Sequence, residues 1–264
     1  MTSTDQRREK AFPSVLHRYR PPEDLEAGYA RETLIDNKLY ATSPARFNDP
    51  FDCRANLSFE GAKQQWRGFF AELFRKTLRH QTSSQRKAAV AEALARKAWK
   101  DPDVQNRFLR DLQDIVDQTG VICFCESATI PLMWSHYAKG HTGYCLRFRT
   151  NYFPFSQAMP VRYTTEFPRP SALDTPQRQV EALFITKAIW WEYECEWRFV
   201  GYEHGLGHRA FAPEALEAVI VGHRASDQLR EELLRLAALR TSPTPVFQAR
   251  PSTTRFELDL IQLS

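Results

Sequence analysis

Residues 194–202 read ECEWRFVGY, a run in which charged and apolar side chains alternate. Successive side chains of a β-strand point to opposite faces, so this period of two predicts a strand. One face would carry Glu194, Glu196 and Arg198, and the other would place apolar side chains in the core. The run therefore predicts a sheet with at least one buried face.

Further strand and helix patterns lie on both sides of this run. Strands are expected at 15–20, 38–42, 121–125, 143–149, 160–163, 218–221, 246–249 and 255–261. Helices are expected at 23–35, 131–138, 177–189 and 226–239, and over most of 61–118. Together these patterns predict an α+β fold with a mixed, mostly antiparallel central sheet, flanking helices and a helical insertion.

Length and composition favour one domain. With 264 residues, of which 42% are hydrophobic, the chain can bury one sizeable core without requiring a second. We predict a single domain over residues 1–264, with a disordered tail at about 1–13 and a basic helical insertion at about 61–118.

The chain shows no targeting or membrane signal. Its N-terminal stretch lacks the apolar core of a signal peptide, and no segment approaches the ~20 apolar residues of a membrane span. The five cysteines are irregularly spaced and include no CxxC pair, which is typical of reduced thiols. We therefore expect a cytoplasmic protein with no membrane partner.

Positive charge is concentrated in one part of the insertion. Residues 61–100 contain ten lysines and arginines against two glutamates, a net charge of +8. Such a segment can face a nucleic acid or another polyanion, although a solvated helix face is the simpler interpretation.

The two glutamates of the opening run are candidate catalytic residues. Carboxylates two residues apart on a strand lie about 6 to 7 Å apart, so burial could separate an acid–base role from an electrostatic one. A solvated strand face with cross-strand salt bridges explains Glu194 and Glu196 equally well.

Two other segments carry candidate binding residues. FNDPFD at 47–52 has the composition of an Asx turn, and the bracketing phenylalanines indicate that Asn48, Asp49 and Phe51 form either a structural turn or a site wall. CFCES at 123–127 ends a strand at Ser127, and the helix that follows presents Trp134 and Tyr137.

Metal and phosphate-loop motifs are missing from the sequence. His136 and His141 fit no HExxH pattern, and neither GxGxxG nor GxxxxGK[ST] occurs, so we predict no metal site. A bound nucleotide would be held by arginines and aromatic side chains instead.

Several separated motifs resemble the bacterial domain of unknown function family 2971. In chain order from residue 16 to residue 222, they are LHRYRP, LYATSPARFNDPFD, CFCES, MWSHYAKGHTGYCLRF, and WWEYECEWRF followed by AVIVG. Residues 61–118 and the chain after residue 222 carry none of these motifs. The family resemblance names no activity.

The same motifs resemble, more weakly, the ADP-ribosyltransferase superfamily. Its pattern is an arginine or histidine on a first strand, a serine or tyrosine motif after a second strand, and a glutamate near a third. Here Ser127 and the ExE element at Glu194 and Glu196 correspond to the last two parts. The first part corresponds to His17, Arg18 or Arg20 on the first strand, where Tyr19 also lies as a candidate binding residue.

The superfamily resemblance implies a split sheet that binds NAD as substrate without a glycine-rich loop. Glu196 would then stabilise the positive charge that develops on the nicotinamide ribose, and Glu194 would orient or deprotonate the acceptor. A first-strand arginine would bind pyrophosphate, and Tyr137 or Trp134 would stack on nicotinamide. The acceptor would be a macromolecule, protein or nucleic acid, and the protein a toxin or a phage-defence effector.

Two other functions remain open at the level of sequence. A metal-dependent phosphodiesterase or nuclease would use the carboxylates and the imidazole of Asp49, Asp52, Glu194, Glu196 and His136. A non-catalytic nucleotide-binding module would use the same residues for recognition and salt bridges.

Overall fold

The computed structural model describes residues 11–263, which form two compact units. Unit 1 comprises residues 1–42, 119–163 and 189–264, and unit 2 comprises 43–118 and 164–188. The tail predicted at about 1–13 lies mostly outside the described residues. The segment predicted as an insertion, 61–118, falls within unit 2.

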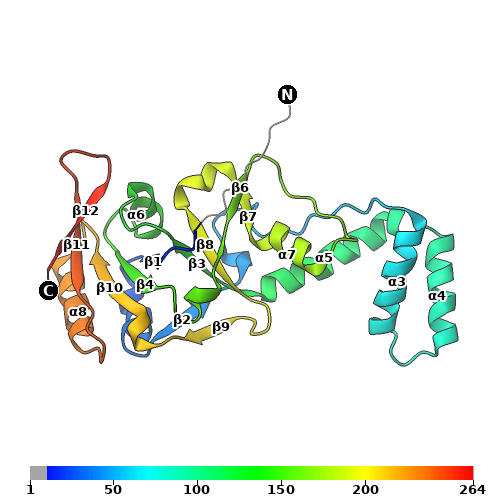
Figure 1. The fold of residues 1–264 in the computed structure, drawn as a ribbon, viewed down its shortest axis with the longest axis horizontal. Coiled ribbons are helices and arrows are strands. Elements are labelled where there is room, and N and C mark those ends of the chain that lie inside the picture. The colour runs from blue at the N-terminus through cyan, green and yellow to red at the C-terminus, as the bar shows by residue number, and fades with distance from the viewer. Residues whose placement is uncertain (1–10, 264) are drawn as a thin grey trace. The chain divides into compact units, whose positions relative to one another are not determined.

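Unit 1 is built on an eight-stranded sheet in the order β12-β11-β10-β4-β1-β3-β8-β5 (Figure 1). Neighbouring strands are antiparallel except β10 and β11, which are parallel. The prediction of an α+β fold with a mostly antiparallel sheet is therefore confirmed. The strands are β1 (Val15–Arg20), β3 (Gly120–Cys125), β4 (Tyr144–Arg149), β5 (Met159–Pro160), β8 (Glu196–Gly201), β10 (Leu216–Val221), β11 (Val246–Pro251) and β12 (Leu258–Gln262).

Helices cover both faces of this sheet. On one face, α2 (Tyr29–Leu34) and α8 (Asp227–Ala238) pack against a cluster of apolar strand residues that includes Leu16, Phe148 and Val219. On the other face, α6 (Pro131–Tyr137) places Met133 and Trp134 over the strands. Figure 1 shows α8 beside β10 and β11. Every residue of β8 is buried.

Short elements complete unit 1. They are α1 (Glu23–Glu26), the strand pair β2 (Lys38–Ala41) and β9 (Gly207–Ala210), and the 3-10 helices η3 (Phe155–Gln157), η4 (Ile189–Glu194) and η5 (Pro213–Ala215). β6 (Arg162–Thr164) lies where the chain passes from unit 1 to unit 2. The helix expected at 23–35 is instead two helices, because Gly28 adopts a left-handed φ of 84° between them.

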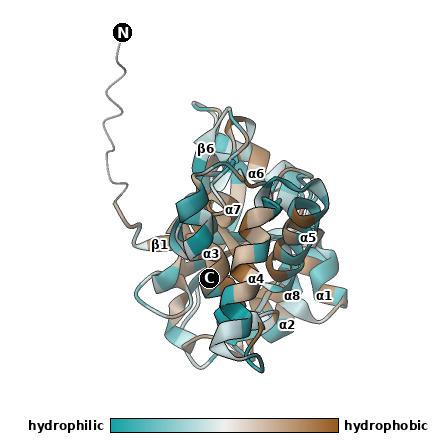
Figure 2. Ribbon diagram, turned by 90° about the vertical axis from the view of Figure 1, so that its right-hand side faces the viewer, coloured by the Kyte–Doolittle hydropathy of each residue, from teal (hydrophilic) through white to brown (hydrophobic). Residues whose placement is uncertain are grey.

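Unit 2 is mainly helical. Its elements are η1 (Pro44–Arg46), α3 (Lys63–Thr77), α4 (Ser83–Ala95), η2 (Ala98–Lys100), α5 (Pro102–Gln118), α7 (Pro176–Phe184) and β7 (Thr186–Ala188). Trp66 lies at the centre of its core, stacked on Trp99 at 5.9 Å and on Phe59 at 6.2 Å. Figure 2 shows hydrophobic (brown) and hydrophilic (teal) residues on different sides of α5, the amphipathic pattern that buries one side of a helix.

None of the helices within residues 11–263 is long and apolar enough to cross a membrane.

Candidate active site

Strand pairing brings three of the sequence motifs into one row across unit 1. His17 on β1 lies opposite Cys125 on β3, and Cys125 lies opposite Glu196 on β8. Side chains at directly opposed positions point to the same face of a sheet. All three side chains are buried, with exposed fractions of 4%, 1% and 5%. Adjacent strands lie about 4.8 Å apart, so the row from His17 to Glu196 spans about 10 Å of backbone.

Glu196 is held by Arg198 two residues along the same strand. Both side chains lie on one face, as the period of two requires, and Arg198 is completely buried. Its Nε and Nη2 each donate a hydrogen bond of 2.8 Å to Glu196, one to each carboxylate oxygen. This bidentate hydrogen bonding offsets part of the desolvation cost of burying the two charges.

Glu194 reaches the site by a different backbone path from the one predicted. It ends η4, and β8 begins only at Glu196, because Cys195 has a left-handed φ of 44°. The prediction that Glu194 lies on the same strand face is therefore wrong. Its carboxylate is nevertheless buried and accepts a 2.5 Å hydrogen bond from the Tyr137 hydroxyl on α6.

Each of the two glutamates is hydrogen-bonded to a tyrosine. Tyr137 binds Glu194, and the Tyr163 hydroxyl accepts a 2.8 Å hydrogen bond from the backbone N–H of Glu196. Burial raises the pKa of Tyr137, and the negative charge of Glu194 raises it further. Burial likewise raises the pKa of Tyr163, although the hydrogen bond from the backbone N–H of Glu196 opposes part of the shift. Both phenols therefore stay protonated at neutral pH and can act as hydrogen-bond donors.

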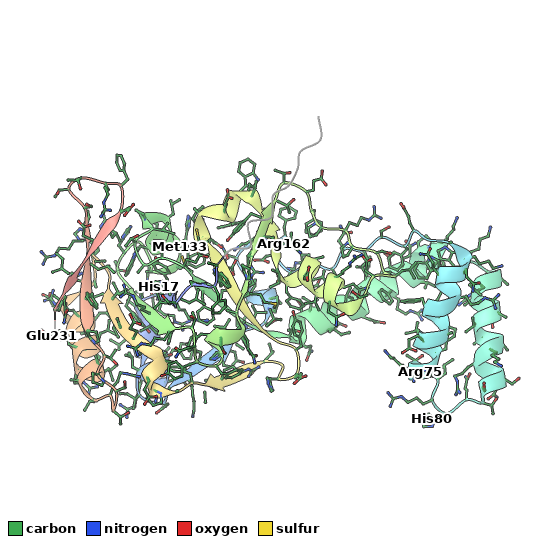
Figure 3. The ribbon with its side chains drawn as sticks, viewed as in Figure 1. His17, Arg75, His80, Met133, Arg162 and Glu231 are labelled. Atoms are coloured by element: carbon green, nitrogen blue, oxygen red, sulfur yellow. The ribbon has the colours of Figure 1, made fainter. Side chains whose placement is uncertain are left out.

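His17 is a buried, neutral imidazole. Its Nε2 accepts a 3.1 Å hydrogen bond from Nε of Arg147, so the proton resides on Nδ1. Burial and the positive charge of Arg147 lower the pKa of His17 to about 4, although the neighbouring backbone of Cys125 and Glu126 opposes part of the shift. Figure 3 labels His17 on its strand and Met133 on α6, the helix that packs against β1.

The two first-strand arginines lie on the opposite face from Glu196. Arg18 on β1 lies opposite Leu146 on β4, so the two side chains share a face. Leu146 belongs to the apolar core on the side of α2 and α8. Burial lowers the pKa of Arg18 to about 10. Arg20 forms an ion pair with Asp24. Of the first-strand candidates, His17 and Tyr19 therefore share a face with Glu196, and the arginines do not.

Tyr19, Ser127 and Trp134 are used in local structure. The Tyr19 hydroxyl donates a 2.7 Å bond to the Ser127 carbonyl, and Trp134 donates a 2.8 Å bond to the carbonyl of Ala128. The two rings meet edge to face at 5.2 Å. The Ser127 hydroxyl accepts a 3.0 Å bond from the N–H of Thr129. These contacts fix the loop that follows Cys125.

The FNDPFD motif belongs to unit 2. Asp49 accepts a 2.9 Å bond from the Phe51 N–H, which confirms the Asx turn. Phe51 is 65% exposed and meets Phe167 edge to face at 6.1 Å, and Asn48 is also exposed. Within the same unit, the buried Asp52 lies 3.7 Å from Nζ of Lys187.

An aromatic group beside Glu194 was not recognised from the sequence. The rings of His136, Trp191 and Tyr193 lie 6.1 to 6.4 Å from one another, and Trp190 is 82% exposed at the start of η4. The sequence WWEYE was the available signal, because it places three aromatic side chains directly before Glu194. Tyr163 carried no signal, since its contact depends on the strand pairing.

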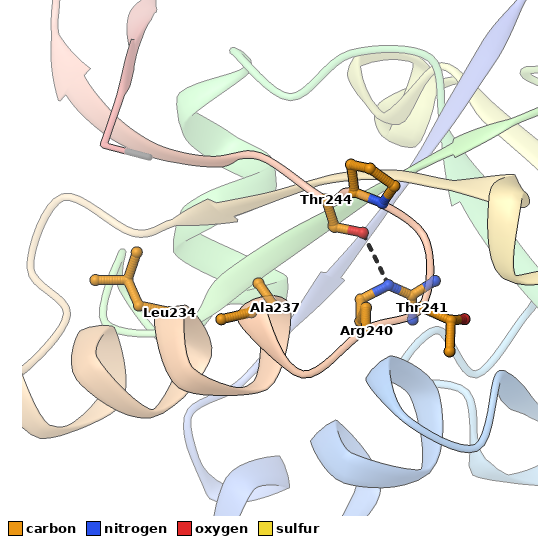
Figure 4. A pocket seen from close by; sticks show the side chains of 7 residues that line it. Leu234, Ala237, Arg240, Thr241 and Thr244 are labelled. Atoms are coloured by element: carbon orange, nitrogen blue, oxygen red, sulfur yellow. Dashed lines mark hydrogen bonds between the residues drawn. The ribbon is translucent and has the colours of Figure 1, made fainter.

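No group of three or more histidine, cysteine, aspartate or glutamate side chains within residues 11–263 is arranged to hold a metal ion. A cavity of about 550 Å³ in unit 1 lies away from the carboxylates, at the end of α8 (Figure 4). Arg240 in its wall bonds Thr244 at 2.8 Å, Asn37 at 3.1 Å and the Pro213 carbonyl at 2.6 Å. These bonds tie the end of α8 to neighbouring loops, so we assign that cavity a structural role.

The comparisons with known proteins concern the segment that holds the glutamates. No curated protein and no solved structure matches the chain. Residues 133–199 match the sequence model of a family described as Protein of unknown function (DUF2971). The matched stretch includes Tyr137, Tyr163, Glu194, Glu196 and Arg198. Through this part of the site, the chain is similar to the DUF2971 family.

Proposed function

We propose that the protein is an ADP-ribosyltransferase that uses NAD as substrate and modifies a macromolecule. The observation that carries the proposal is the row of His17, Cys125 and Glu196 across β1, β3 and β8, with Glu194 directly before it. In the superfamily that the motifs resemble, a first-strand histidine or arginine, a second-strand motif and a glutamate surround one NAD. The resemblance further implies a toxin or phage-defence effector that works in the cytoplasm.

The reaction breaks the bond between C1′ of the ribose and the nicotinamide nitrogen. Nicotinamide leaves with the bonding electron pair, and positive charge develops on the ribose as in glycoside hydrolysis. A nucleophile of the acceptor then forms a bond to C1′ and releases one proton. The products are nicotinamide, the ADP-ribosylated acceptor and the proton.

Glu196 is the residue that stabilises the developing charge. Arg198 binds both carboxylate oxygens of Glu196 and fixes them in place. The negative charge of this carboxylate would face the ribose and stabilise the positive charge as it develops. Arg198 is a positioning residue, because its rigid fork fixes the rotamer of Glu196.

Glu194 and His17 take the remaining roles. Glu194 orients or deprotonates the acceptor, and the bond from Tyr137 fixes its carboxylate. His17 takes the first-strand role, because it lies on the Glu196 face and the two arginines do not. As a neutral imidazole with its proton on Nδ1, it can donate one hydrogen bond to the dinucleotide.

The test is release of nicotinamide from NAD by the purified full chain, with and without cell lysate as a source of acceptor. Glu196→Gln should abolish release and keep NAD binding. Glu231→Gln is the matched control, because this exposed carboxylate on α8 is remote from the site (Figure 3). Release should persist in chelator.

Three outcomes would overturn the proposal: release unchanged in Glu196→Gln, release lost in chelator, or no release together with no NAD-induced shift in melting temperature. Glu196→Gln leaves Arg198 facing a neutral amide, so its melting temperature must be measured. If it unfolds, the double variant Glu196→Gln/Arg198→Met replaces it, because removing both charges avoids an unpaired buried ion.

A further inference from the structure

The connected helices α3 and α4, with η2, carry the positive charge of unit 2. Residues 61–100 hold ten lysines and arginines against two glutamates. Nine of the ten cations are exposed, and Arg86 is half-buried. The structure therefore places a net charge of +8 at the surface, where it meets solvent.

Most of these cations have no acidic partner among residues 11–263. Arg75 and Lys76 both pair with Glu72, at 2.7 and 3.3 Å. Arg79 and Arg86 donate to backbone carbonyls near the turn between α3 and α4. The remaining six form no ion pair with any residue that the structure describes: Lys63, Arg67, Lys87, Arg96, Lys97 and Lys100.

Five of the unpaired cations gather at one end of the hairpin. α3 and α4 run antiparallel (Figure 1), so the start of α3 lies beside the end of α4. Trp66 on α3 stacks on Trp99 of η2, and this contact holds the start of α3 near the residues that follow α4. In the sequence, the five cations lie within a few residues of these two tryptophans. We call this group the basic end; it consists of Lys63, Arg67, Arg96, Lys97 and Lys100. Arg75 and His80 mark the opposite end in Figure 3.

The basic end offers charge without an apolar or stacking surface. Trp66 and Trp99 are 1% and 6% exposed, and no large hydrophobic side chain between residues 61 and 100 is exposed. A membrane-surface helix needs an apolar face to insert, and single-stranded nucleic acids are held largely by stacking on aromatic rings. A duplex backbone needs only cations and polar groups that contact phosphates.

We propose that the basic end of unit 2 binds the phosphate backbone of duplex nucleic acid without reading its base sequence. The binding is independent of ADP-ribosyl transfer and of NAD. Its function is to hold the protein on a polyanion, by an attraction whose strength depends on salt.

The probe is a fluorescently labelled 20-base-pair DNA duplex, titrated with the full chain without NAD between 50 and 200 mM salt. If all five cations contact phosphates, the logarithm of affinity falls against the logarithm of salt with a slope of about −4.5. Affinity then drops by about 500-fold across this range. Two duplexes of unrelated sequence should bind with the same Kd within about twofold.

The decisive comparison uses two variants of α3 with the same change in charge. Lys63→Gln/Arg67→Gln removes two unpaired cations, so the slope should become less steep by about 1.8 and affinity at 0.1 M salt should fall by about 60-fold. Arg75→Gln/Lys76→Gln removes two cations that Glu72 already pairs, so affinity should change by less than about threefold.

Equal losses in the two variants would show a diffuse charge effect and overturn the assignment to the basic end. So would a preference above about tenfold for one duplex, comparable binding to phosphatidylserine vesicles, or tighter binding to a single strand than to the duplex. All four cations are exposed, so both variants should keep the wild-type melting temperature.

Discussion

Replacing His17 by glutamine should remove a specific part of the acid sensitivity of the fold. In the folded protein, burial and Arg147 lower the pKa of His17 from 6.5 to about 4. In the unfolded chain the imidazole returns to its ordinary pKa. Between these two values the unfolded chain binds a proton that the folded protein does not, so the free energy of unfolding falls as pH falls. Well above pH 6.5 neither state binds the proton, and the effect disappears.

The magnitude follows from the two pKa values. A shift from 6.5 to about 4 corresponds to about 3 kcal/mol at pH well below both values. By linkage, about 2 kcal/mol of this is lost by pH 5 and about 3 kcal/mol by pH 4. Glutamine does not titrate, and its amide oxygen can still accept the bond from Arg147. The variant should therefore lose less stability than the wild type over this window.

The assay is urea denaturation followed by circular dichroism at pH 7, 6, 5 and 4. Subtracting the two curves of unfolding free energy against pH cancels the titration of all other groups. His80→Gln, in the exposed turn after α3, is the matched histidine-to-glutamine control. If the wild-type and His17→Gln curves stay parallel within 0.5 kcal/mol from pH 7 to pH 4, the assignment of His17 as a buried neutral base is wrong.

Three more perturbations test the site. Arg198→Met removes the guanidinium that binds the buried Glu196 carboxylate, so the free energy of unfolding in urea should fall by about 3–5 kcal/mol. Adding Glu196→Gln to this variant should recover most of the loss. Tyr19→Phe removes the hydroxyl bond to the Ser127 carbonyl and should cost about 1 kcal/mol in the same assay. Burial raises the pKa of the Cys125 thiol to about 12, so iodoacetamide at pH 8 should label it only after unfolding, as mass spectrometry can determine.

Local periodicity predicted most elements of the sheet but not their partners. The alternation predicted from Glu194 and the apolar run that ends at Cys125 are properties of short segments. Both segments form strands, although the first strand begins only at Glu196. The segment at 38–42 also forms a strand, but it pairs with β9 outside the main sheet. The sequence pattern of a strand does not specify its neighbour, because pairing depends on side chains far away in the chain.

The composition of the site was predictable, and its geometry was only partly so. The sequence indicated both glutamates, Tyr137 and the first strand. It did not indicate that Cys195 turns left-handed and moves Glu194 off the strand, because a non-glycine residue adopts that conformation only when its surroundings hold it there. It also left His17 and Arg18 as alternatives, since a shift of one residue in strand register exchanges the two faces.

The polar residues on the α6 face of the sheet are not explained by stability alone. Glu194, Glu196, Arg198 and His17 are all buried there, whereas the opposite face of β3 and β8 contributes Ile122, Phe124, Trp197 and Phe199 to an apolar core. Burying a paired carboxylate and guanidinium is commonly no better for stability than burying apolar side chains of similar volume. Buried ionisable groups with a shifted pKa occur preferentially at functional sites. The double variant Glu196→Gln/Arg198→Met separates the two explanations, because a functional pair predicts a folded protein of near wild-type stability that releases no nicotinamide. If the pair is structural, the double variant should be less stable than the wild type. Nicotinamide release should then be equal in the two proteins or absent from both.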